Sequence, residues 1–122
     1  MNPDTNKAVI EGYFAELRKD KTSAIDTFVA EEELKQHILM YEASFPGYWL
    51  ESQEMIAERD LVSIRGVVHG VHTGPLMQLP PTGKQVTVPF FIIYRIADEK
   101  IVQHWMLVDM PSLMQQLGAV QA

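Results

Sequence analysis

The 122-residue chain contains no cysteine, which excludes disulfide bonds, thiolate metal sites and a cysteine nucleophile. Basic residues are also scarce, because 10 Lys and Arg stand against 16 Asp and Glu and the formal net charge is -6. A chain of this charge has no electrostatic footprint for nucleic acid or for an anionic membrane surface. We therefore expect no nucleic acid and no membrane among its partners.

Long apolar runs are missing as well. No stretch approaches the roughly 18 apolar residues that a membrane-spanning helix requires. The opening residues, MNPDTNKAVIEGYF, lack the basic segment followed by an apolar run that marks a signal peptide. Together with the lack of cysteine, these features favour a cytoplasmic protein. Because the sequence also shows no repeat and no linker, we expect a single domain over residues 1–122.

Apolar residues recur at helical spacing through the first 45 residues. Asp4 or Thr5 can cap the first of the resulting helices, and Thr22 or Ser23 can cap the second. Glutamates 31–33 place negative charge at the start of the third helix, where the helix dipole favours it. The pattern predicts helices over residues 5–18, from about 22 to 29 and from about 31 to 45.

From residue 48 onward the apolar residues alternate, as they do in strands that bury one face. Gly66 and Gly70 interrupt one of these strands and are expected to mark a bend or a bulge, and Gly118 is expected to stop a closing helix. The pattern predicts strands over residues 48–57, 61–72, 85–96 and 101–109, and a helix over residues 111–117. Helices followed by consecutive antiparallel strands indicate an α+β domain with its helices on one face of a curved sheet.

Two motifs suggest a bound group and are rejected on their context. The segment GPLMQLPPTGK ends in Gly-Lys, but Gln85 and a strand follow where a phosphate loop needs Ser or Thr and a helix. His69 and His72 form an HxxH pair, but residues three apart on a strand point to opposite faces. We therefore expect no cofactor and no metal.

Several longer segments resemble the SnoaL-like polyketide cyclase family, which includes proteins called ester cyclases. They are HGVHTGPLMQLPPTGKQVTV, FFIIYRIADEKIVQHW and VDMPSLMQQLG. The resemblance implies the cone-shaped nuclear transport factor 2-like fold, with three N-terminal helices packed on a strongly bent mixed sheet around an apolar pocket. It also implies homodimers formed through the sheet. Because that superfamily hosts isomerases, hydrolases and proteins without a known reaction, the fold alone does not give the activity.

The resemblance implies a position for the chemistry. In the antibiotic-pathway cyclases an aspartate on the last strand is the acid/base of an intramolecular aldol reaction, and it aligns with Met106. A histidine on the preceding strand aligns with Ile92. A thioether and an alkyl group cannot accept and return a proton, so this mechanism does not transfer to the present chain.

Strand parity predicts the lining of the pocket if position 106 faces it. The lining is then mostly apolar, with His104 and the Tyr94 hydroxyl as its polar groups: Val88, Phe90, Ile92, Tyr94, Val102, His104, Met106 and Val108. His72 matches the histidine of the family's HTG motif, where it either ties down the loop or contacts the ligand. Asp109, two residues before Pro111, is expected to cap the final helix.

Two classes of function remain open. The chain is either a small enzyme that uses His104 as the acid/base on a hydrophobic carbonyl or ester, with Tyr94 or His72 orienting it, or a non-catalytic pocket or dimerisation module. Both classes imply a small hydrophobic ligand. On the opposite sheet face Trp105 and Leu107 would be exposed, which favours a homodimer.

Overall fold

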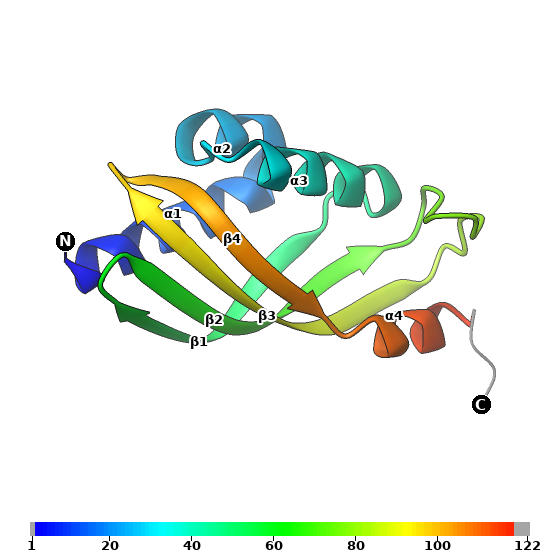
Figure 1. Ribbon diagram of the computed structural model, residues 1–122. Coiled ribbons are helices and arrows are strands. Elements are labelled where there is room, and N and C mark those ends of the chain that lie inside the picture. Colours follow the sequence, from blue (N-terminus) through cyan, green and yellow to red (C-terminus); the bar gives the residue numbers. More distant parts are fainter. Residues whose placement is uncertain (1, 119–122) are drawn as a thin grey trace.

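The computed structural model describes residues 2–118 and contains four helices and four strands (Figure 1). In chain order these elements are α1 (Pro3–Lys19), α2 (Lys21–Phe28), α3 (Glu32–Ser44), β1 (Trp49–Glu58), β2 (Leu61–Val71), β3 (Gln85–Ala97), β4 (Lys100–Val108) and α4 (Met110–Leu117). Each element begins and ends within two residues of the prediction. None of the described helices is both long and apolar enough to cross a bilayer.

The first two helices are capped by residues other than those predicted. The side chain of Asn2 accepts a hydrogen bond from the backbone N–H of Asp4, and Asp20 accepts one from the N–H of Ser23. Both helices begin earlier than their apolar periodicity indicates, so the cap of each moves toward the N-terminus with its first turn. Asp109 caps α4 as predicted.

The four strands form one curved sheet in the order β1-β2-β3-β4, and α1, α2 and α3 lie on one side of it (Figure 1). Each neighbouring pair of strands is antiparallel, so the mixed sheet implied by the resemblance is wrong for these strands. The parallel pairing in residues 2–118 is a single isolated bridge between Val29 and Ile101. The α+β class and the cone-shaped arrangement are confirmed.

A bulge in β4 changes which residues face the helices. The pairing register between β3 and β4 shifts between Arg95 and Ile96, so that Ile101 and His104 both point inward. Val102 lies between them and is 38% exposed, on the outer face. The predicted inward position of Val102 was therefore wrong, because a single extra residue reverses the alternation that parity assumes.

A second irregularity, in β1, lies opposite Gly66 of β2. The register shifts between Ser52 and Glu54, next to the pair of Ser52 with Gly66. A Cβ atom on Gly66 would lie 2.2 Å from the carbonyl oxygen of Glu51. Only glycine therefore permits this close approach of the two strands, which agrees with the bulge predicted near Gly66.

We predict that Gly66→Ala destabilises the fold by about 1–3 kcal/mol, because the methyl group must displace the backbone of β1. The measurement is the free energy of unfolding from urea titration. Gly12→Ala is the matched control, since its Cβ would meet only the ring edge of Phe28 at 3.3 Å, and alanine favours the interior of α1. Equal stability of Gly66→Ala and the wild type would contradict the prediction.

Candidate functional site

A partly open cavity lies between α3 and the inner face of the sheet, with a volume of ≈ 50 Å³. Helix α3 supplies one side of it through Leu34, His37, Ile38 and Tyr41, and the residue that follows the helix, Phe45, extends that side. Apart from His37 and the tyrosine hydroxyls, the side chains that line it are apolar. A space of this size holds a few water molecules, whereas pockets for larger ligands measure about 300–1,000 Å³.

Five of the residues predicted to bind the ligand line this cavity: Val88, Ile92, Tyr94, Met106 and Val108. Ile92 of β3 and Met106 of β4 are direct partners across the two strands. Phe90 is buried in the core and is not among the lining residues, although it shares their face of β3. Its ring instead lies near the inner side of Gly66.

His72 is fully buried outside the cavity lining and holds the loop between β2 and β3. Its Nδ1 atom accepts a hydrogen bond from the backbone N–H of Thr82 at 3.1 Å and lies 3.0 Å from the Thr82 hydroxyl. Its backbone N–H donates to the carbonyl of Lys84. Since Nδ1 accepts, the ring proton of the neutral imidazole is on Nε2.

His104 is buried and bonds through both ring nitrogens. Its Nδ1 atom lies 2.5 Å from a carboxylate oxygen of Glu31, and its Nε2 atom lies 3.2 Å from Nδ1 of His37. An ionised carboxylate only accepts, so Nδ1–H of His104 donates to Glu31 and Nε2 of His104 accepts from His37. When both imidazole rings are neutral, Nε2 of His37 carries no proton and is the free end of this series of hydrogen bonds. The described lining of the cavity includes His37 but not His104.

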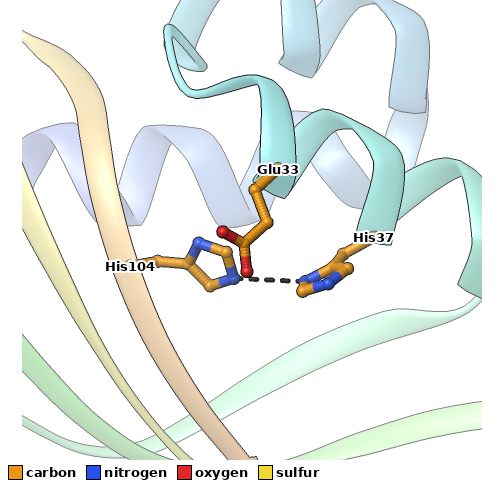
Figure 2. Close-up of side chains that lie close together, drawn as sticks. All are labelled: Glu33, His37 and His104. Atoms are coloured by element: carbon orange, nitrogen blue, oxygen red, sulfur yellow. Dashed lines mark hydrogen bonds between the residues drawn. The ribbon is translucent and has the colours of Figure 1, made fainter.

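Glu33 lies beside this pair of histidines (Figure 2). Glu33 and His37 both project from α3 toward His104 on β4, and one ligating atom from each of the three residues lies within 4.8 Å of the others. The site therefore contains two carboxylates and two imidazoles beside an apolar cavity.

Sequence reasoning missed Glu31, Glu33 and His37 as functional candidates. The spacing of Glu33 and His37, four residues apart in a predicted helix, already places them on one face. No such local signal exists for the contact of His104 with Glu31 or with His37, because these partners are separated by 73 and 67 residues. Only the packing of α3 against β4 brings them together.

All four tyrosines of the chain line the cavity: Tyr13, Tyr41, Tyr48 and Tyr94. Burial raises the pKa of each hydroxyl above its ordinary value. The pKa of Tyr13 is raised further by Tyr94 and Tyr48, and that of Tyr48 by Glu42 and Tyr41. Tyr48 also raises the pKa of Tyr94, whereas the hydrogen bond with Tyr13 lowers it. At neutral pH these side chains are therefore hydrogen-bonding phenols and not phenolate bases.

The helical layer on one side of a curved antiparallel sheet is the cone-shaped nuclear transport factor 2-like architecture. Residues 6–117 match the model of the SnoaL-like polyketide cyclase family, and the chain belongs to that family. No curated protein matches the chain.

Solved structures with the same fold include three proteins from Streptomyces. AclR from Streptomyces galilaeus is 25% identical, with a TM-score of 0.85 and coverage of 99% of this chain and 85% of AclR. TsrD from Streptomyces laurentii is 21% identical, with a TM-score of 0.84 and coverage of 98% and 99%. IdmH from Streptomyces antibioticus is 22% identical, with a TM-score of 0.79 and coverage of 93% and 98%.

We predict that the tyrosines resist ionisation while the protein is folded. Their raised pKa values stabilise the folded state fully below pH about 10, the unfolded value, and this stabilisation is lost as pH rises toward the folded values. Absorbance at about 295 nm and circular dichroism, followed together in an alkaline titration, should therefore report tyrosinate only as the fold is lost, with Tyr41 the first to ionise. Ionisation of all four near pH 10 with unchanged dichroism would contradict this.

Proposed function

We propose that this protein is a small enzyme of the cyclase or isomerase type, which moves a proton on a largely apolar carbonyl compound bound in the cavity. The observation that carries the proposal is the hydrogen-bonded chain Glu31–His104–His37, whose last member lines the cavity. In this proposal His37 is the catalytic base, and His104 is a positioning residue instead of the acid/base expected from the sequence.

The chemistry follows from the hydrogen-bond donors and acceptors of Glu31, His104 and His37. Nε2 of His37 takes a proton from the carbon beside the carbonyl group, and the C–H electron pair moves onto the carbonyl oxygen. A tyrosine hydroxyl of the lining donates a hydrogen bond to that developing oxyanion. The imidazolium formed at His37 keeps its Nδ1–H bond to His104, whose other nitrogen donates to the negative Glu31. This arrangement holds His37 in the tautomer that a base requires.

One of the similar solved structures, IdmH, agrees with this class of substrate. IdmH is described as a candidate polyketide cyclase, and AclR as a candidate hydroxylase. Cyclisation of a polyketide begins with removal of a proton beside a carbonyl group. In this chain the base would act from α3, across the cavity from Met106, the position that the resemblance assigns to the family's aspartate.

A second candidate function is a pocket that binds an apolar ligand without chemistry. The small cavity volume, ≈ 50 Å³, supports it, because a polyketide-sized ligand must first displace side chains of the lining. Met106 and Tyr41 are among the lining residues that are only partly buried. Binding alone does not separate the two candidates, whereas proton transfer does.

We predict that the wild type catalyses exchange of deuterium into the carbon beside the carbonyl of cyclic ketones and β-keto esters in D₂O. Proton NMR measures the rate. His37→Ala should lower it by about 10²- to 10⁴-fold, the usual contribution of a general base. Glu31→Gln should lower kcat with little change in KM, because it disturbs the tautomer and not the cavity wall.

His69→Ala is the control, because His69 bonds to Glu51, stacks on Trp49 and lies outside the cavity lining. Wild-type exchange that survives His37→Ala would reject His37 as the base. Binding of the same ketones without any exchange in the wild type would reject catalysis and leave the second candidate.

We also propose that the outer face of the sheet forms a homodimer. Phe91 pairs with Leu107 across β3 and β4, and Ile93 pairs with Trp105, so the four side chains form one apolar patch. All four are exposed, and Leu107 is 73% exposed. An exposed apolar patch of this kind can be buried against a second copy related by a two-fold axis.

We predict a dimer by sedimentation velocity at micromolar concentration. Leu107→Asp should shift the protein to monomer, because a charge at the centre of the apolar patch would be desolvated in the dimer. Leu39→Asp is the control, since Leu39 is equally an exposed apolar residue but lies on α3, which packs on the other side of the sheet. A monomeric wild type would refute the proposal.

A further inference from the structure

We propose that Glu33, His37 and His104 form a binding site for one divalent transition-metal ion. Two imidazoles and one carboxylate are a ligand set that such ions accept, Zn²⁺ among them. The sequence analysis weighed only His69 and His72 as ligands and expected no metal. This inference goes beyond the proposed function and does not depend on it.

The two histidines already have the separation of metal ligands. Nε2 of His104 and Nδ1 of His37 face one another at 3.2 Å. Two nitrogens bound at 2.0–2.1 Å to a tetrahedral Zn²⁺ lie about 3.3 Å apart. A metal ion can therefore take the place of this hydrogen bond, after a turn of both rings that aims the two nitrogen lone pairs at the ion.

Glu33 supplies the third ligand. Its carboxylate and the two nitrogens lie within 4.8 Å of one another, so a modest turn of an exposed side chain brings an oxygen to the ion (Figure 2). The cation nearest to Glu33 in the sequence, Lys35, pairs with Glu32. Three consecutive glutamates at this end of α3 add negative charge that attracts a cation.

Glu31 prepares His104 for this role. By accepting from Nδ1–H, it fixes the tautomer in which Nε2 carries the lone pair that a metal needs. A carboxylate behind a ligating histidine is the usual outer partner of metal-bound imidazole and strengthens it as a ligand. Glu31 therefore serves the site without touching the ion.

The metal-bound and metal-free forms differ at the cavity. When Nδ1 of His37 binds the ion, the proton of the neutral ring moves to Nε2, which then donates instead of accepting. Three protein ligands also leave one position of a tetrahedral ion open for water or a carbonyl oxygen. Glu33 takes no part in the proposed proton transfer. A substitution of Glu33 therefore tests metal binding without changing the residues of that proton transfer.

The experiment titrates tag-free, chelator-treated protein with Zn²⁺ by calorimetry and with Co²⁺ by visible absorption. We expect one ion per chain and the visible bands of cobalt bound to nitrogen and oxygen ligands. Glu33→Gln and His37→Ala should each weaken binding at least about tenfold, and Glu31→Gln should weaken it by about 10- to 100-fold. Glu32→Gln and His69→Ala are matched controls and should bind as the wild type does.

Absence of stoichiometric binding would overturn the proposal, as would affinity that is lost in His69→Ala but kept in Glu33→Gln. If the circular dichroism spectrum shows that a variant is unfolded, the cobalt bands of the variants that remain folded decide whether the site binds the metal. Deuterium exchange by chelator-treated wild type tests the proton-transfer proposal separately, because no metal is then present. The two proposals can therefore fail independently.

Discussion

The contact between Glu31 and His104 sets the relation between the helices and the sheet. The two residues are 73 positions apart, and beside them the N–H of Ala30 donates to the carbonyl of Ile101 at 2.8 Å. The connection between α2 and α3 is thus joined to β4 by one side-chain pair and one backbone bond. Because α3 begins directly after this connection, its approach to the sheet is fixed there. The cavity under α3 and the position of His37 in its wall both depend on it.

This contact is costly by the ordinary rules of stability. A carboxylate that is only 16% exposed loses hydration and must recover it through a partner. Glu31 also occupies the N-cap position of α3 without making a side-chain cap bond, a loss of about 1 kcal/mol. Real proteins break local rules mainly at functional sites. The placement of Glu31 therefore supports a functional role for the histidines that it orients.

The alternation and periodicity of apolar residues were sufficient to predict the fold and the part of the cavity wall that the sheet supplies. Alternation along β3 correctly placed Val88, Ile92 and Tyr94 in the cavity wall, because side-chain direction in a regular strand follows parity. The same rule failed at Val102, where a bulge that leaves no mark in composition reverses the alternation. The hydrogen bonds that join Glu31, His104 and His37 could not be predicted, since these residues share no strand or helix face. His104 was recognised as polar and inward, but its partners were set by tertiary packing.

Met106 has a physical role of its own in the wall of the cavity. Helix α3 is held at both ends. At its start Glu31 bonds to His104 of β4, and at its end the hydroxyl of Ser44 donates to the carbonyl of Pro75 in the loop after β2. Widening the cavity by moving α3 would break one of these bonds. The space must then come from side chains of the wall, and methionine has three rotatable bonds and no branching. Met106 beside Ile92 therefore gives an adaptable apolar wall, while His37 stays on the fixed helix that faces it.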